Sequence, residues 1–349
     1  MMMRIGTGLA VLAASAALAA SAMAQQINGA GATFPAPVYT KWGEAAKDKL
    51  NLALNYQAIG SGGGINQITN RTVDFGASDA PLTADKLKAG NLVQFPAVMG
   101  AIVLTVNLPD VQDKALKLTG DIVADLYLGK IERWNDKRIA DLNPGLKLPT
   151  ARVAPVYRAD ASGTTYQFAS YLAEVSPEWK EKVGAGTSVK WPAGVGARGN
   201  DGVASGVKNT RGAIGYVEYV YAKLNNLVVT QIRNKDGNFV APTIEGFQAA
   251  AASADWKSDP TFGISLLNQP GKNSWPIVAP TFILVPTNPT NPDATRNVLR
   301  FFEWSFSNGD KIAEDLAYVP IPQAVTDMVR TSWSNNLKDS AGKPLWGAR

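Results

Sequence analysis

The chain has 349 residues, a formal net charge of +5, and neither cysteine nor histidine. Without cysteine there can be no disulfide, thiolate nucleophile, zinc finger, iron–sulfur cluster or lipid-bearing cysteine at a processed N-terminus. Without histidine there can be no Ser-His-Asp or Cys-His catalytic pair and no imidazole metal ligand. Lysine and arginine are scattered along the chain and form no long block, so we do not expect nucleic acid as a partner.

The N-terminus has the pattern of a secretory signal peptide. Arg4 gives a positive start, residues 5–20 are apolar and small, and Ala22-Met23-Ala24 matches an A-x-A cleavage site. We expect cleavage after Ala24, which removes residues 1–24 and leaves 325 residues with a net charge of +4. No stop-transfer flank follows, so we expect an exported protein that does not itself span the membrane. The alternative is a retained membrane helix.

From residue 25 onward, strand-like runs alternate with segments of helical spacing, which is typical of α/β proteins. In chain order we expect a helix over 38–49, a strand over 52–56, a helix over 65–70, strands over 73–77 and 101–107, a helix over 120–126, a strand over 153–157, a helix over 166–172, a strand over 213–217, a helix over 243–252, a strand over 277–285, and helices over 293–307 and 324–335.

Two apolar, extended stretches bounded by proline, 95–108 and 275–286, are long enough to cross between two lobes. We therefore expect lobe 1 to comprise residues 25–105 and 275–349, and lobe 2 to comprise residues 106–274. The length after cleavage also fits two domains. One long buried strand in a single large sheet would give the same pattern and is the alternative.

Three turns combine glycine, hydroxyl groups and an expected helix start. They read GAGATFP from residue 29, GSGGG from residue 60 and DASGTT from residue 160. Helix N-termini present unpaired N–H groups and a positive dipole end, and glycine lets that backbone approach an anion closely. For any one of these turns, an ordinary helix cap or turn is the alternative.

These turns could surround a tetrahedral oxyanion. Arg158 can give two charge-assisted hydrogen bonds, with Asp160 orienting its guanidinium. The other candidate donors are the hydroxyls of Thr33, Ser61, Ser162 and Thr164 and the backbone N–H groups of Phe34, Gly163 and Thr164.

Asp79 is the unusual member of this set. A carboxylate repels an anion unless the anion carries a proton that the carboxylate can accept. Phosphate retains a proton near neutral pH and sulfate does not, so Asp79 would select phosphate. The alternative for Asp79 is a cap at the end of a strand.

Enzyme motifs are incomplete in this chain. Ser61 lacks the first glycine of G-x-S-x-G, and the S-x-x-K match at residues 205–208 lacks its companion elements, so we expect a helix surface there. No G-x-x-x-x-G-K-[ST] occurs, which excludes a nucleotide P-loop. Gly194, Gly196 and Gly199 match G-x-G-x-x-G, but Trp191-Pro192 stands where a strand should end, so we expect a loop.

Several segments together closely resemble the PstS family of periplasmic phosphate-binding proteins, which serve phosphate ABC importers. They are GAGATFPAP from residue 29, DFGASDAPL from 74, YLGKI from 127, RADASGT from 158, GAIGYVEY from 212 and KDS from 338. The resemblance runs in order over essentially the whole chain after residue 24. It implies a type II periplasmic binding protein fold, in which two α/β lobes on a two-strand hinge close over one phosphate with no cofactor and no metal.

Carried over to this sequence, the family's phosphate ligands fall on Thr33, Phe34 through its backbone, Ser61, Asp79, Arg158, Ser162, Gly163 and Thr164, with Asp160 as the partner of the arginine. Two positions depart from the family pattern: Ala161 stands where glycine is common, and Gly62 stands where serine is common.

The resemblance also implies a periplasmic location, no enzymatic activity, a monomer, and partners that are the transmembrane permease subunits of an ABC importer with separate ATP-binding subunits. The alternatives are a binding protein for arsenate, sulfate or molybdate, and a secreted phosphate-ester hydrolase with Asp79 or Ser61 as nucleophile.

Overall fold

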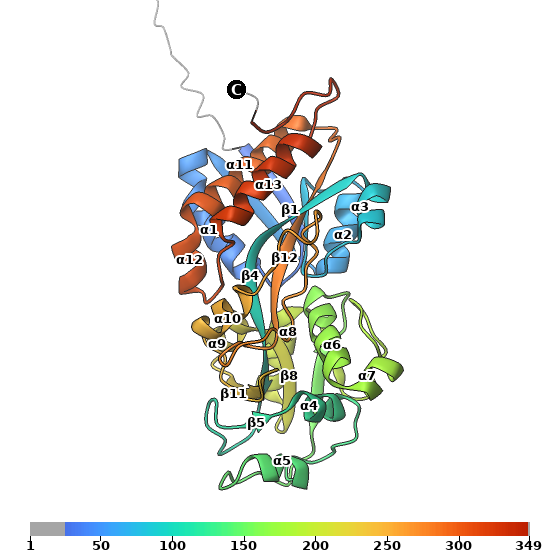
Figure 1. Ribbon diagram of the computed structural model, residues 1–349, viewed down its shortest axis with the longest axis vertical. Coiled ribbons are helices and arrows are strands. Elements are labelled where there is room, and N and C mark those ends of the chain that lie inside the picture. The colour runs from blue at the N-terminus through green and yellow to red at the C-terminus, as the bar shows by residue number, and fades with distance from the viewer. Residues whose placement is uncertain (1–24, 348–349) are drawn as a thin grey trace, which may run out of the picture.

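The structure is a computed structural model in which residues 25–347 are described. They form two lobes along the long axis of the molecule, one from the two ends of the chain (blue and red in Figure 1) and one from its middle (green and yellow). The strands are β1 (Gln25–Gly31), β2 (Leu52–Ala58), β3 (Phe75–Ser78), β4 (Leu92–Val106), β5 (Lys117–Leu118), β6 (Ala154–Arg158), β7 (Val195–Ala197), β8 (Ala213–Glu218), β9 (Val228–Val229), β10 (Gln231–Arg233), β11 (Phe239–Val240) and β12 (Val278–Pro286). The helices are α1 (Ala36–Leu50), α2 (Ser61–Thr69), α3 (Ala84–Gly90), α4 (Gly120–Tyr127), α5 (Lys137–Leu142), α6 (Gly163–Val175), α7 (Pro177–Lys182), α8 (Gly199–Asn209), α9 (Tyr219–Leu224), α10 (Ile244–Ala251), α11 (Pro292–Asn308), α12 (Asp310–Asp315) and α13 (Gln323–Asn336).

One path of paired strands runs through both lobes in the order β2-β1-β3-β12-β4-β8-β6-β7, and β9 also pairs with β4. In the first lobe β1 is parallel to β2 and β3, and in the second lobe β6 is parallel to β7 and β8. Between these two parallel groups, β4 and β12 pair antiparallel. The α/β fold class with two lobes is therefore confirmed.

The long strand β4 connects the lobes. Its residues 92–101 pair with β12, and its residues 102–106 pair with β8 of the second lobe. Every residue of β12 is buried, and so is every residue of β4 except Val93, which explains why both strands are mostly apolar. The lobe boundaries at residues 105 and 275 stay a prediction.

The strand expected over 101–107 begins earlier, at Leu92, and the extended stretch expected over 95–108 covered only part of this difference. Gln94 and Pro96 interrupt the apolar pattern before residue 101. In the fold, the Gln94 side chain accepts from Leu82 N at 2.9 Å and donates to the carbonyl oxygens of Leu82 and Thr261 at 3.1 and 2.8 Å. Pro96 lies opposite Phe282, beside a register shift at which β4 has one extra residue, Ala97, and a strand tolerates a residue without an N–H group there.

The expected helices are all present, but α2 and α6 begin at Ser61 and Gly163, earlier than the expected residues 65 and 166. Glycines with low helix propensity hide the start of α2. One of them is required by packing, because a Cβ atom at Gly64 would lie 2.5 Å from the Ala30 carbonyl oxygen. The first turn of α2 therefore lies directly on the backbone of β1.

The expected loop at residues 194–199 is wrong. Residues Val195–Ala197 form the edge strand β7, and Gly199 begins α8. A strand of three residues with an exposed Val195 at an edge has no apolar pattern to predict it. Residues 205–208 lie in α8, as expected. Across residues 25–347, no helix is long and apolar enough to cross a membrane.

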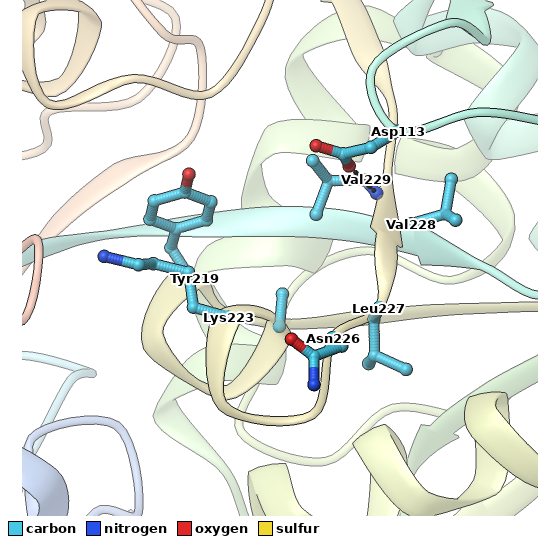
Figure 2. A pocket seen from close by; sticks show the side chains of 8 residues that line it. Asp113, Tyr219, Lys223, Asn226, Leu227, Val228 and Val229 are labelled. Atoms are coloured by element: carbon cyan, nitrogen blue, oxygen red, sulfur yellow. Dashed lines mark hydrogen bonds between the residues drawn. The ribbon is translucent and has the colours of Figure 1, made fainter.

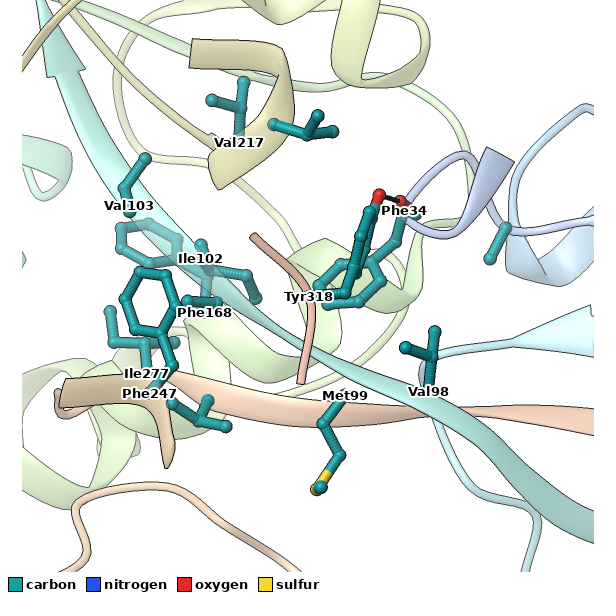
Figure 3. Packing of buried hydrophobic residues seen from close by; sticks show 14 of the residues in the cluster. Phe34, Val98, Met99, Ile102, Val103, Phe168, Val217, Phe247, Ile277 and Tyr318 are labelled. Atoms are coloured by element: carbon teal, nitrogen blue, oxygen red, sulfur yellow. Dashed lines mark hydrogen bonds between the residues drawn. The ribbon is translucent and has the colours of Figure 1, made fainter. Parts of the chain in front are cut away.

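The hydrophobic core follows β4 from one lobe into the other. Val98, Met99 and Ile102 of this strand belong to one buried cluster that also contains Phe34 and Tyr318 (Figure 3). The Phe34 and Tyr318 rings meet edge to face, with centroids 6.2 Å apart. The core thus extends to the loop after β1, and this packing holds the loop in place.

Candidate functional site

The nine expected site residues meet between the two lobes. The first lobe supplies those on the loops after β1 and β3 and at the start of α2, and the second supplies those at the end of β6 and the start of α6. Parallel strands direct the loops at their carboxyl ends to one edge of a sheet, which is where α/β proteins bind ligands. All nine except Asp160 are buried: Thr33, Phe34, Ser61, Asp79, Arg158, Ser162, Gly163 and Thr164.

Hydrogen bonds connect the two groups of residues. Gly163 N donates to Ser61 Oγ at 3.0 Å, and Asp79 N donates to the same oxygen at 3.2 Å. Gly62 N donates to the Ala161 carbonyl oxygen at 2.9 Å. Because Ser61 Oγ accepts from two N–H groups, its own hydroxyl hydrogen is free to be donated to a ligand.

Three backbone amides of the site have no protein acceptor. Within residues 25–347, the N–H groups of Thr33, Phe34 and Thr164 make no hydrogen bond, and all three residues are buried. Such groups are rare, because a buried N–H without a partner costs about 1–3 kcal/mol. Thr164 lies in the first turn of α6, where the helix dipole also favours negative charge. A bound anion could accept a hydrogen bond from each of the three N–H groups.

Arg158 places a fixed positive charge beside these amides. Its side chain is 1% exposed, and Nε donates to Asp160 Oδ1 at 2.7 Å while Nη2 pairs with Asp160 Oδ2. Nη1 lies 3.4 Å from Thr164 Oγ1. These contacts use three of the five guanidinium N–H groups and fix the guanidinium plane. The other two N–H groups are available to an anion.

The Asp160 carboxylate stays ionised to hold this arginine. Its partial burial acts to raise its pKa, but the ion pair with Arg158 and the hydrogen bond from Gly199 N lower the pKa below its usual value. Gly199 N donates to Asp160 Oδ1 at 3.1 Å, so the first residue of α8 also supports the pair.

The pKa of Asp79 is shifted in the opposite direction from that of Asp160. It is 1% exposed, and burial raises its pKa to about 7, although a hydrogen bond from Thr281 and the charge of Arg158 both act to lower it. Thr281 Oγ1 donates to Asp79 Oδ1 at 2.8 Å. The hydrogen bonds of residues 25–347 include none to Oδ2. A buried carboxyl group with this pKa can accept or supply one proton near neutral pH.

Three supporting residues were missed by the sequence analysis. Asn200 Nδ2 donates to Thr33 Oγ1 at 2.8 Å, Gln167 Nε2 donates to the Asp79 carbonyl oxygen at 2.6 Å, and Thr281 binds Asp79 as described. Gln167 and Thr281 are polar residues among buried apolar neighbours of α6 and β12, and that contrast was the available signal. For Asn200 the sequence carries no comparable signal.

The two departures from the family pattern lie against each other. A Cβ atom added at Gly62 would lie 2.4 Å from the Ala161 Cβ, which is closer than side-chain carbons approach. Gly62 lies in α2 of the first lobe, and Ala161 precedes α6 of the second. The methyl group of Ala161 therefore occupies the space that a side chain at position 62 would need.

The surface hollows of residues 25–347 include one at the site and one on the second lobe. A cleft of about 320 Å³ borders the site and is lined by Thr33, Ala58, Ile59, Asp160, Arg198, Gly199 and Asp201. A pocket of about 430 Å³ lies where α9 meets β9 (Figure 2). Tyr219 and Lys223 line this pocket, with Lys223 Nζ 5.9 Å from the Tyr219 ring centroid. The pocket contains none of the nine expected residues, so we place the site at the cleft.

Comparison with known proteins identifies the family. A family model described as a PBP superfamily domain matches residues 16–308. The phosphate-binding protein PstS of Pasteurella multocida is 47% identical over 338 residues, which are 97% of this chain and 98% of that protein. PstS of Haemophilus influenzae is 48% identical over 317 residues, which are 91% of this chain and 95% of that protein.

The chain belongs to the PstS family. Solved structures agree with this family at the level of the fold. The crystal structure of a DING protein has a TM-score of 0.73 at 21% identity and covers 92% of this chain and 99% of its own. The phosphate-bound structure of the periplasmic protein PfluDING has a TM-score of 0.70 at 22% identity and covers 89% and 95%. The PstS resemblance expected from the motifs is confirmed.

Proposed function

We propose that this PstS family member captures inorganic phosphate in the periplasm and delivers it to an ABC importer. The observation that carries the proposal is the set of buried N–H groups without protein acceptors, gathered with Arg158 and Asp79 in one site between two lobes. The relatives that are 47% and 48% identical are named phosphate-binding proteins, which supports this ligand.

In the proposed complex, both lobes donate to one anion. The first lobe supplies Thr33, the Phe34 N–H, Ser61 and Asp79. The second lobe supplies Arg158, Ser162 and Thr164, with Asp160 holding the arginine. Gly163 would join them by moving its N–H from Ser61 Oγ to the anion. A ligand that contacts both lobes favours the closed arrangement over an open one by its differential affinity. The closed form would then dock on the permease.

Asp79 would make the site selective for phosphate. A proton on the phosphate can be donated to Asp79 Oδ2, which accepts no hydrogen bond from residues 25–347. Sulfate brings no proton, so it would leave two negative oxygens facing each other in a buried site. A site that leaves such a group unpaired rejects the wrong ligand by several powers of ten.

Calorimetry on the mature protein with phosphate, sulfate and arsenate tests the proposal. At pH 9, two units above the pKa of Asp79, we expect one phosphate bound per chain and sulfate binding weaker by at least about a hundredfold. Equal affinity for phosphate and sulfate would contradict the proposed role of Asp79, and absence of phosphate binding would contradict the function. Because we infer no enzymatic activity, we expect no steady turnover of a chromogenic phosphate ester, and turnover would favour a hydrolase instead.

The proposal also covers cleavage of the N-terminal signal peptide, the oligomeric state and the membrane partners. We expect the mature chain to begin at Gln25 and to act as a monomer, with permease subunits as its membrane partners and separate subunits binding ATP. Mass spectrometry of the protein from a periplasmic extract tests the cleavage. A mass that includes residues 1–24 would contradict it, and sedimentation of the purified protein as a dimer would contradict the monomer.

A further inference from the structure

Three consecutive carbonyl groups in the loop after β1 each accept a hydrogen bond from a tyrosine hydroxyl. Tyr56 Oη donates to the Ala32 oxygen at 2.7 Å, Tyr221 Oη to the Thr33 oxygen at 2.5 Å, and Tyr318 Oη to the Phe34 oxygen at 2.6 Å. Figure 3 shows the last pair, with Tyr318 beside Phe34. The three tyrosines come from β2, from α9 and from the segment after α12.

These hydroxyls fix the direction of the amide donors in the same loop. A peptide unit is planar and trans, so the carbonyl of one residue and the N–H of the next point in opposite directions. Holding the Ala32 oxygen therefore directs the Thr33 N–H, and holding the Thr33 oxygen directs the Phe34 N–H. These are two of the buried N–H groups without a protein acceptor.

Tyr221 differs from the other two tyrosines because it comes from the second lobe. It lies on α9, which directly follows β8, whereas Thr33 follows β1 of the first lobe. Asn200 of α8 holds the Thr33 hydroxyl from the same side, with Nδ2 at 2.8 Å. Both contacts therefore exist only when the lobes are together.

The helix α9 separates this contact from the pocket in Figure 2. Tyr219 and Lys223, one turn apart, face the pocket, whereas Tyr221 is two residues from Tyr219 and so lies on the opposite side of the helix. Tyr221 is also buried, with 4% of its surface exposed. Removing its hydroxyl therefore affects the Thr33 carbonyl and leaves the outer face of α9 unchanged.

We propose that Tyr221 is a positioning residue for phosphate binding: its hydroxyl, supplied by the second lobe, orients the Thr33–Phe34 peptide so that the Phe34 N–H faces the anion when the lobes are together. The inference rests on the proposed function. Because the Tyr221 hydrogen bond forms only in the closed arrangement, the Phe34 N–H is oriented toward the anion only there. Phosphate binding and lobe closure therefore favour each other.

The test is Tyr221→Phe, which removes one hydroxyl and keeps the ring. We expect phosphate affinity to fall about 5- to 150-fold, the effect of leaving a buried carbonyl unpaired. Since the contact forms only on closure, the loss should appear as a faster dissociation rate in stopped-flow measurements, with the association rate changed less than about twofold. The melting temperature without phosphate should equal that of the wild type.

Tyr171→Phe is the matched control, because Tyr171 is a buried tyrosine of α6 in the second lobe. We expect it to bind phosphate like the wild type. As a further readout, the Phe34 amide proton should shift downfield on phosphate binding in ¹⁵N-edited NMR spectra, and this shift should be smaller in Tyr221→Phe.

Two results would overturn the inference while leaving the function intact. One is wild-type affinity in Tyr221→Phe while the unmodified protein binds phosphate normally. The other is a weaker affinity that comes with an equally lowered melting temperature without phosphate and an unchanged Phe34 shift, which would indicate a purely structural role. If the wild type itself bound no phosphate, the proposed function would fall, and the inference with it.

Discussion

The half of the site on the second lobe is held by its own neighbours in sequence, whereas the half on the first lobe is held by residues far away. In the second lobe, Asp160 orients Arg158 from two residues on, and Ser162 Oγ accepts from Thr165 N at 3.1 Å to cap α6. In the first lobe, Thr33, Phe34 and Asp79 depend on partners that are 188, 284 and 202 residues away.

The two halves also differ in charge. The second lobe offers an ionised arginine whose partner carboxylate has a lowered pKa. The first lobe offers neutral amides and hydroxyls and one carboxyl group whose pKa burial raises to about 7. We infer that the second lobe supplies most of the attraction for an anion and that the first lobe decides which anion is accepted.

Removal of Arg158 should have the largest effect. Arg158→Ala deletes the fixed positive charge of the second lobe and should weaken phosphate binding by about 2–5 kcal/mol, as expected for truncating a buried charged partner. Calorimetry at constant salt measures this loss. Arg158→Lys is the control that keeps the charge but loses the two-point geometry, and it should lie between the alanine variant and the wild type. A loss below threefold in Arg158→Ala would contradict the assigned role.

Asp79→Asn should change how stability depends on pH. Because the folded pKa of Asp79, about 7, exceeds the ordinary value of 3.8, the folded state binds the proton more tightly than the unfolded state. The resulting stabilisation is present below about pH 4 and is lost as the pH rises through 7. In the arrangement with the lobes together, Asp79→Asn should therefore gain about 2–4 kcal/mol over the wild type between pH 4 and pH 8.

Urea unfolding at a series of pH values measures this difference. Glu218 is also buried, and burial raises its pKa, so it gives both proteins a slope of the same sign. The slope is slightly smaller in Asp79→Asn, because the charge of Asp79 adds to the raised pKa of Glu218. Parallel stability curves for the two proteins from pH 4 to pH 8 would show that the Asp79 carboxyl group is not titrating in this window.

Close packing between Gly62 of the first lobe and Ala161 of the second should limit which side chains position 62 accepts when the lobes are together. Gly62→Ser places a Cβ atom 2.4 Å from the Ala161 Cβ across the lobes, so we expect phosphate affinity to fall by about 1–3 kcal/mol, the usual effect of overpacking. Ala161→Gly alone should bind nearly as the wild type does, and Gly62→Ser with Ala161→Gly should recover most of the loss. Additive effects in this double-mutant cycle would contradict the contact.

The contrast between the halves also explains how much the sequence could predict. The second half is largely a local motif, since Arg158 to Thr164 contain the ligands and the Asp160 support, with Thr165 and Gly199 adding hydrogen bonds, and the turn chemistry can be recognised along the chain. For the first half, the sequence predicted the residues that contact the anion but not the residues that hold them in place. Thr281 lies in an apolar strand, and nothing in the sequence links its hydroxyl to Asp79. Asn200 and Tyr221 come from α8 and α9, and these helices lie beside Thr33 only because β4 connects the two lobes.

The same reason applies to the fold. Helices and strands with a clear period were predicted, because burial of one face leaves a pattern in the sequence. The start of β4 and the start of α2 were not, because Gln94 is satisfied by the carbonyl groups of Leu82 and Thr261, and Gly64 is required by contact with β1. In both cases a tertiary contact compensates for a residue that the local pattern disfavours.

The smallest expected effect, about 1.4 kcal/mol per pH unit, tests the selectivity assigned to the first lobe. Above pH 7 the Asp79 carboxyl group is increasingly ionised, and sulfate, which has no proton, can bind only the protonated form. Its affinity should fall about tenfold per pH unit between pH 7 and pH 9. Dianionic phosphate still carries one proton to donate, so its affinity should stay nearly constant over the same range. Calorimetry of both anions at pH 7, 8 and 9 measures the two slopes, with Asp79→Asn as the variant that should lose the sulfate slope. A phosphate affinity that falls in parallel with that of sulfate would mean that Asp79 does not accept the proton from the ligand.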